Sequence, residues 1–368
     1  MIRLSRKGKI DLFLKVVSDP DRKPLNKILG ELIKLSIINM EFPGHYFTSY
    51  LFKNDIVGVE NYLPPKLTEK IAPGLNDKRL KELLDNKLYF YLFYRQFNVN
   101  TPRVLMFNHG ERFYMNDEVF TVKSPEDFLR RMKILFELHP LSKSVILKKI
   151  YSSSKGSDIY KIDALKVETN HESIHELFNR IIQSEFIFQE TVIQHPSVNL
   201  LNPSSVNTLR MDTFIDKGGN AHVLSGYVRM STCNSFVDNI GSGGCMVGVD
   251  LDSGVLKRYG YTNFHLNPTE RLTCHPLTKT VFEGFRIPFI QEAKELITRS
   301  ALLMPGLRLV GWDVAIGIDG PVIIEGNFDY GIRGNDLNYG GYRAHPVFSK
   351  VLQEFNMKQP VKRAGLMT

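Results

Sequence analysis

The chain has few of the residues that stabilise small secreted folds or mark membrane spans. Its 368 residues include three cysteines, Cys233, Cys245 and Cys274, without the paired spacing of zinc ligands. Such cysteine usage argues against a disulfide framework and fits a reducing cytoplasm. No apolar run reaches the ~18–20 residues that a membrane-spanning helix needs. We therefore expect a cytoplasmic protein with no transmembrane segment.

The N-terminus lacks the features of a cleaved signal peptide, because Asp11 and Lys15 interrupt the apolar stretch that follows its first basic residues. The formal net charge of +8 favours anionic ligands such as nucleotide phosphates, acidic sugars or lipid. The basic residues are scattered and lack an RNA-type aromatic motif, so we expect no nucleic-acid partner. The basic N-terminal segment leaves a peripheral membrane contact open, although a solvated charged face explains it more simply.

A chain of this length can form two or three lobes with their own cores. We predict an N-terminal helical region, a first subdomain, a main domain and a loose basic tail, over residues 1–76, 77–142, 143–355 and 356–368. The apolar patterns predict helices over 77–96, 172–183 and 286–302, and one more beginning after Ser124. They predict strands over 104–107, 144–150, 186–190, 207–214, 221–230 and 245–250.

Residues 311–327 are the most informative segment, because two strand-like apolar runs flank an Asp-Gly pair. Asp313 lies on the first run, and Glu325 and Asn327 lie two residues apart on the second. Alternate side chains of a strand share a face, so Glu325 and Asn327 point to the same side. Three oxygen donors on one sheet face suit Mg²⁺. A surface hairpin with solvated acids is the alternative for this segment taken alone.

The length of the loop decides whether the two acids meet. A two-residue loop of Asp319 and Gly320 would set Asp313 opposite Gly326, on the face away from Glu325. A three-residue loop that begins at Ile318, with Gly320 in the left-handed region and a bulge, would set Asp313 opposite Glu325. We predict the three-residue loop.

Two further segments have the character of nucleotide contacts. The strand-like run 145–149 ends in Lys148 and Lys149, and the small-residue loop 152–157 follows it. A lysine there can meet a polyphosphate while loop amides cover it. Neighbouring strand residues face opposite ways, so the pattern leaves the choice between the two lysines open. The apolar strand 186–190 can form a wall of an adenine pocket.

In this order, the lysine strand, the adenine strand and the Asp…Glu-x-Asn pattern resemble the ATP-grasp superfamily. Short motifs within roughly residues 143–335 resemble those of its sugar-transfer-associated branch. They are Gln194-His195-Pro196, Asn202–Arg210, Val237-Asp238-Asn239, His275-Pro276 and Gly311–Ala315. The resemblance implies an α+β, ATP-grasp fold, in which two α+β subdomains clasp ATP after a smaller N-terminal α/β region.

The resemblance also implies roles for individual residues. The nucleotide contacts would be Lys87, Lys148, Gln189, Glu190 and Asn207, with motif alignment favouring Lys148 over Lys149. One or two Mg²⁺ ions would be held by Asp313, Glu325 and Asn327. Gly311 stands where the D-alanine–D-alanine ligases have an arginine, so another cation must stabilise the tetrahedral intermediate. The catalytic candidates are Arg210, at the phosphates or the acyl-phosphate, and Arg229 and Arg333.

The resemblance therefore predicts an ATP- and Mg²⁺-dependent ligase. A carboxylate would be activated as an acyl-phosphate and joined to an amine or a sugar acceptor, in surface-polysaccharide or other glycan assembly. Two other hypotheses stay open: a kinase that phosphorylates a hydroxyl, and a nucleotide-binding module without turnover. No feature of the sequence predicts an oligomeric state.

Overall fold

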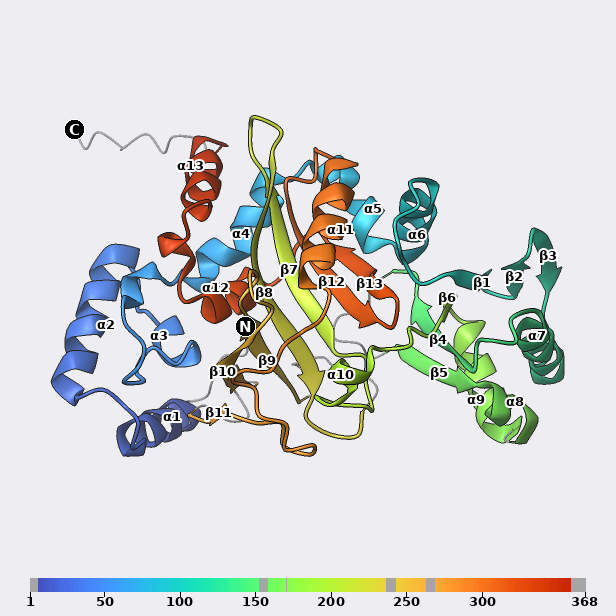
Figure 1. The fold of residues 1–368 in the computed structure, drawn as a ribbon, viewed down its shortest axis with the longest axis horizontal. Helices are drawn as coiled ribbons and strands as arrows, with labels where there is room; N and C mark the ends of the chain where they lie inside the picture. Colours follow the sequence, from blue (N-terminus) through green and yellow to red (C-terminus); the bar gives the residue numbers. More distant parts are fainter. Residues whose placement is uncertain (1–5, 152–157, 170, 236–242, 263–268, 359–368) are drawn as a thin grey trace.

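Two antiparallel sheets and the helices around them form the molecule (Figure 1). The computed structural model describes residues 6–151, 158–169, 171–235, 243–262 and 269–358. The six-stranded sheet has the order β3-β2-β1-β6-β4-β5, and the seven-stranded sheet has the order β11-β10-β9-β8-β7-β12-β13. This is the α+β, ATP-grasp architecture that the sequence predicts.

The six-stranded sheet is built from short, half-buried strands. They are β1 (Val104–His109), β2 (Arg112–Met115), β3 (Glu118–Thr121), β4 (Ser144–Lys149), β5 (Ile159–Asp163) and β6 (Glu185–Glu190). Its core packs against α7 (Pro125–Leu138), α8 (Ala164–Thr169) and α9 (His171–Ile181). Ser124 caps α7, because its hydroxyl accepts the Asp127 N–H at 3.2 Å, as its position before the helix predicts. The boundary predicted between 142 and 143 falls inside this sheet, because β1 pairs with β6.

The seven-stranded sheet contains the longest and most buried strands. They are β7 (Thr208–Ile215), β8 (Ala221–Ser231), β9 (Gly244–Val249), β10 (Leu256–Tyr261), β11 (Arg271–Leu272), β12 (Leu309–Gly317) and β13 (Gly320–Asn327). On one face Leu209, Met211 and Trp312 pack against α11 (Ile290–Leu302). The other face meets α12 (Ile332–Tyr339), and α4 (Pro65–Leu75) and α13 (Phe348–Lys358) extend that core.

The hairpin of β12 and β13 sets Asp313 opposite Glu325, as predicted, but by another route. Gly317 pairs with Gly320, so the loop has two residues, Ile318 and Asp319, and the predicted three-residue loop is wrong. The register shifts by one residue further along, where Ile324 is the extra residue of a bulge. The loop is fixed from outside the hairpin, since the Ile318 N–H donates to the Ile193 carbonyl at 3.1 Å.

The described part of the N-terminal region, predicted over residues 1–76, is helical. It consists of α1 (Arg6–Ser18), α2 (Leu25–Asn39), α3 (His45–Thr48), η1 (Val59–Asn61) and α4, with one isolated bridge between Arg22 and Lys53. The bridge alone does not make a sheet. The limits predicted at residues 76 and 355 stay predictions, and the tail beyond 358 lies outside the described residues.

The helix predicted over 77–96 is divided into η2 (Lys78–Leu80), α5 (Lys81–Asp85) and α6 (Lys87–Gln96). Asn86 causes the break, because its side chain accepts the N–H groups of Leu88 at 3.0 Å and Tyr89 at 2.9 Å and so caps α6. The remaining short helices are α10 (Pro196–Asn199) and η4 (Tyr342–Ala344). Within the described ranges, every helix is too short or too polar to span a membrane.

Candidate functional site

A cleft of about 160 Å³ lies between the two sheets. It is lined by Lys87, Pro102, Ile146, Lys148, Ile159, Gln189, Glu190, Thr191, Val192, Val206, Thr208, Arg229, Asp313, Ile324 and Glu325. Of the eleven predicted site residues, seven lie in this wall: Lys87, Lys148, Gln189, Glu190, Arg229, Asp313 and Glu325. Apolar side chains and a cluster of charges therefore share one concave site.

Strand alternation places Lys148 in the cleft. Val145 and Leu147 are buried in the core of the six-stranded sheet, so Ile146 and Lys148 face the opposite side and line the cleft. Lys149 points to the core side of β4 and forms an ion pair with Asp158 at 3.3 Å. The geometry favours Lys148 as the lysine that faces a ligand in the cleft.

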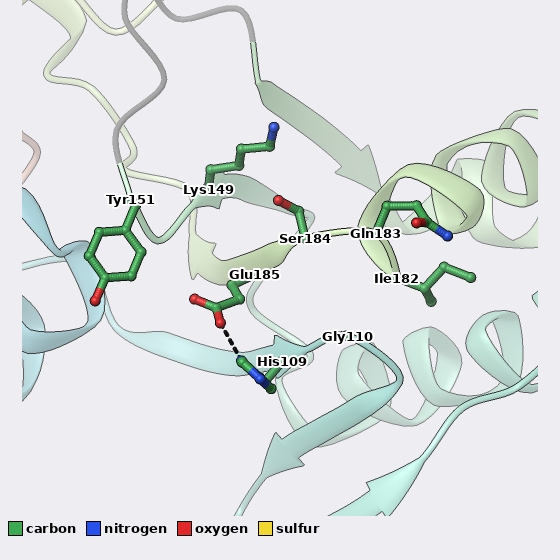
Figure 2. Close-up of a pocket in the computed structure, with 8 residues that line it drawn as sticks. All are labelled: His109, Gly110, Lys149, Tyr151, Ile182, Gln183, Ser184 and Glu185. Atoms are coloured by element: carbon green, nitrogen blue, oxygen red, sulfur yellow. Dashed lines mark ion pairs between the residues drawn. The ribbon is translucent and has the colours of Figure 1, made fainter.

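Lys149 instead borders a second hollow, which is open and holds about 570 Å³ (Figure 2). In that hollow His109 and Glu185 form an ion pair, and Tyr151 stands beside them. The hollow is larger than the cleft, but His109 is mostly exposed and none of the predicted site residues lines it. We therefore place the candidate site in the cleft.

One row of residues crosses four strands of the seven-stranded sheet at the cleft. The pairing sets Tyr227 opposite Arg210, Arg210 opposite Asp313, and Asp313 opposite Glu325. Directly opposed residues point to the same side, so the row presents one phenol, one guanidinium and two carboxyl groups together. Arg229 stands one row further along β8, opposite Thr208.

Asp313 is buried between two arginines. Arg210 donates to both carboxylate oxygens, with Nη2 at 3.0 Å from Oδ2, and Arg229 Nη2 lies 2.7 Å from Oδ2. Arg229 also donates to the Thr208 hydroxyl at 2.9 and 3.1 Å. Burial opposes ionisation of Asp313, but the charges of Arg210 and Arg229 hold the pKa of this carboxyl well below its usual range. Asp313 is therefore a carboxylate at neutral pH.

The donor set at this end of the cleft fits a magnesium ion. The Glu325 carboxyl lies within hydrogen-bonding reach of the Asp313 carboxylate, and two adjacent acids favour a cation between them. The Asn327 amide nitrogen donates to the Gly311 carbonyl at 3.3 Å, which leaves its amide oxygen as the acceptor. Lys87 Nζ lies 3.9 Å from Glu325, so an ammonium group borders the two acids as well.

The strand predicted to form a wall of an adenine pocket, β6, ends at the cleft. Gln189 and Glu190 end β6 and line the cleft opposite Ile146 and Val145 of β4. Gln189 is buried, and its amide nitrogen lies 3.4 Å from the Pro102 carbonyl. Glu190 accepts from the Arg103 backbone at 3.1 Å and from the Arg103 guanidinium at 2.8 Å. These contacts fix the end of the strand.

The ring of Tyr330 fills the space that a side chain at position 311 would need. A Cβ atom at Gly311 would stand 2.6 Å from the Cβ of Tyr330, far closer than atoms pack. Tyr330 is held there by the hydrogen bond from its hydroxyl to Asp212, at 2.8 Å. An arginine at position 311 is therefore sterically excluded, and Arg229 supplies a guanidinium to Asp313 from β8 instead.

Two predicted contacts lie elsewhere. Asn207 is buried beneath the loop before β7, where its amide donates to the carbonyls of Val198 at 3.2 Å and Asn202 at 2.9 Å. It is absent from the cleft wall, so its geometry is that of a loop anchor. Arg333 donates to the Thr48 carbonyl and ties α12 to the N-terminal region, away from Asp313. Neither residue lines the cleft, and the roles predicted for both stay predictions.

Arg210 belongs to the charged row and Asn327 lies next to it, opposite Gly311, but neither lines the cleft itself. Sequence reasoning missed Thr208 and Tyr227, which contact or face the two arginines. The alternation of β7 could have found Thr208, since it stands two residues before Arg210 and shares its face. The predicted covering loop 152–157 and Asn239 lie outside the described residues.

A cleft between two antiparallel sheets, with Lys148 and the end of β6 on one wall and the paired acids on the other, fits the ATP-grasp arrangement that the resemblance predicts. The chain belongs to the sugar-transfer associated ATP-grasp family, whose model matches residues 66–345. No curated protein sequence matches the chain.

Three solved structures are similar to the chain. D-alanyl-alanine synthetase A from Vibrio cholerae is 13% identical with a TM-score of 0.44, over 75% of this chain and 65% of that one. Phosphoribosylamine–glycine ligase from Thermotoga maritima is 15% identical with a TM-score of 0.42, over 76% and 56%. L-amino acid ligase from Bacillus licheniformis is 13% identical with a TM-score of 0.36, over 69% and 42%. The chain thus spans less than two thirds of each of these structures.

Proposed function

We propose that the protein is an ATP- and Mg²⁺-dependent, ADP-forming ligase that activates a carboxylate as an acyl-phosphate and joins it to an amine or a similar nucleophile. The observation that carries this proposal is the position of Asp313, held between Arg210 and Arg229 and opposite Glu325. The row faces the cleft that also contains Lys148. Family membership and this geometry point to the same class of reaction.

Different parts of the cleft would hold the base and the phosphates of ATP. Apolar side chains such as Ile146 and Val206, together with the end of β6, would take the base. Lys148 would neutralise the phosphates from the wall opposite the acids, and Lys87 would do so from beside Glu325. Mg²⁺ held by Asp313, Glu325 and Asn327 would offset the charge that develops on the phosphates during transfer.

Arg229 is the residue that we assign to charge stabilisation. It lines the cleft, whereas Arg210 is buried and does not, so of the two arginines that contact Asp313 it is Arg229 that would face a reacting group. A carboxylate oxygen would attack the γ-phosphorus, and the bond to the bridging oxygen would break as ADP leaves. An amine would then attack the acyl carbon, and phosphate would leave as the amine gives up its proton. Arg229 would stabilise the negative charge in both steps, while Arg210 positions Asp313.

The substrates follow from the family description alone. We propose a small-molecule carboxylate and an amine or sugar acceptor, in surface-polysaccharide or other glycan assembly in the cytoplasm, because the matching family is associated with sugar transfer. No residue of the cleft names the acceptor.

An ADP-release screen tests the proposal. The purified protein is given Mg²⁺-ATP and a panel of carboxylates, with and without amines, and products are identified by mass spectrometry. We expect ADP only with a matching carboxylate, and hydroxylamine should trap the acyl-phosphate as a hydroxamate. A stable phosphorylated product that resists hydroxylamine would show a kinase instead. ATP binding without ADP release across the panel would favour a module without turnover.

A further inference from the structure

Helix α2 is apolar on two faces, although the protein covers only one. Ile28 and Leu35 are buried in the N-terminal core. On the other side Leu29, Ile33 and Ile37 follow one another at a spacing of four residues and are 60%, 54% and 72% exposed. A helix in water normally keeps one apolar stripe toward its core, and one that is apolar all round is normally covered all round.

The exposed stripe continues beyond the helix. Met40 and Phe42 follow it directly and are 91% and 73% exposed, and Leu25 precedes it. We call these six side chains the α2 surface: Leu25, Leu29, Ile33, Ile37, Met40 and Phe42. Of the 25 large apolar side chains exposed in the described residues, ten lie between positions 13 and 57. Figure 1 places α2 along one edge of the molecule. Such a concentration marks an interaction surface.

The first 60 residues, which include α2, carry more positive than negative charge, with ten lysines and arginines against seven acids. The six acids between residues 12 and 60 each form an ion pair with a lysine or arginine: Asp19, Asp21, Glu31, Glu41, Asp55 and Glu60. Glu31, the acid on α2, pairs with the buried Lys23 at 2.8 Å. Lys15 on α1 and Lys27 on α2 are both exposed. The α2 surface is therefore apolar and belongs to a region of net positive charge.

We propose that the α2 surface binds an anionic lipid membrane. From Leu25 to Ile37 the stripe runs about 18 Å at 1.5 Å per residue, so the helix would lie in the plane of the membrane surface. Its apolar side chains would enter the boundary of headgroups and acyl chains, while Lys15 and Lys27 would reach anionic headgroups.

A second copy of the chain fits the surface less well. In a twofold dimer the same patch faces itself, which would bring the positively charged regions of both copies together. The lipid surface has the opposite charge, and it accepts a single protruding helix without needing a complementary groove. The proposal is independent of the ligase reaction, because the α2 surface shares no residue with the cleft.

Vesicle co-sedimentation tests the proposal. The full chain is mixed with phosphatidylglycerol-containing vesicles and with pure phosphatidylcholine vesicles. We expect binding to the anionic vesicles that weakens as salt is raised. The double variant Leu29→Glu, Ile33→Glu should lose about tenfold or more in partition coefficient, because two inserted apolar side chains are replaced by charges repelled by the lipid.

A matched variant controls for charge alone. Leu141→Glu with Leu165→Glu adds the same two charges at side chains that are 92% and 69% exposed. Leu141 follows α7 and Leu165 lies on α8, and Figure 1 shows both helices at the opposite end of the molecule from α2. It should bind vesicles nearly as well as the wild type, and both variants should keep the wild-type melting temperature. Equal loss in both variants, or no binding by the wild type, would overturn the proposal. A wild-type dimer that the α2 variant converts to a monomer without vesicle binding would assign the surface to self-association instead.

Discussion

Asp313 shares its carboxylate with two guanidinium groups while a second acid stands opposite it. Truncating one partner of such a buried group leaves charge uncompensated, so single substitutions here have large effects. Arg210 and Arg229 differ in one respect, since Arg229 also reaches the cleft. We therefore propose a positioning role for Arg210 and a catalytic role for Arg229.

Replacement of Arg229 by alanine should lower kcat by about 10²–10³-fold with a smaller change in the KM for ATP, because the lost guanidinium acts on charge that develops during the reaction. Arg258→Ala is the matched control, since Arg258 is an exposed arginine on β10 of the same sheet. Steady-state ADP release measures both variants. Unchanged turnover in Arg229→Ala would remove this arginine from the mechanism.

Asp212 lies beside the charged row but in a different environment. Burial raises the pKa of its carboxyl from 3.8 to about 6, against hydrogen bonds from Tyr342, Tyr330 and Ser225. The unfolded chain ionises first, so the stability linked to Asp212 is complete below its ordinary pKa and is lost as pH rises toward about 6.

The pH dependence of unfolding tests this assignment. Asp212→Asn removes this ionisable group. The unfolding free energy of the wild type should therefore fall relative to that of the variant as pH rises from about 4 to about 6. Denaturant unfolding at several pH values measures it. A difference that stays constant over that window would show that Asp212 ionises normally in the folded protein.

Single residues were predictable where strand alternation decides them. Alternation predicted that Lys148 and Lys149 face opposite ways but left the choice between them open, and the burial of Val145 and Leu147 in the core places Lys148 on the cleft side. Arg333 could not be placed this way, because its partner is the carbonyl of Thr48, 285 residues earlier in the chain. Its charge suited the chemistry, but only the packing of α12 against the N-terminal region decides where the charge lies.

At the scale of elements, the β12–β13 hairpin brings the acids together through a bulge. Ile324 and Glu325 both line the cleft, as neighbouring residues at a bulge can. The sequence predicts the strands and the pairing of Asp313 with Glu325, but it places the irregularity at the turn. The loop is fixed by contacts with residues 193–195, which no local turn signal reveals.

The packing of Gly311 against Tyr330 gives an element-scale prediction. Gly311→Ala should destabilise the protein by about 1–3 kcal/mol, because the new methyl group must displace the buried ring. Gly331→Ala is the matched control, since a Cβ there meets nothing within 4 Å. Thermal unfolding compares the two variants. Equal melting temperatures would contradict the close packing at Gly311.

At the scale of the whole molecule, two sheets enclose the cleft and the N-terminal helices extend the seven-stranded sheet's outer face. The α+β class and the order of nucleotide segments were predictable from sequence, because apolar periodicity and motif order are local. The described part of the N-terminal region is helical, but the Pro-Gly and Pro-Pro pairs that interrupt its sequence do not show how its helices are joined.

We propose that Asp313 and Glu325 hold a divalent cation against ATP in this cleft. Electron paramagnetic resonance of Mn²⁺ with a non-hydrolysable ATP analogue measures that directly, because bound Mn²⁺ loses its free-ion signal. The wild type and Asp319→Asn, which alters an acid in the hairpin loop, should bind Mn²⁺ equally. Glu325→Gln should weaken binding by about tenfold or more and abolish ADP release, with the melting temperature unchanged. Wild-type Mn²⁺ affinity and turnover in Glu325→Gln would show that Glu325 does not hold the cation.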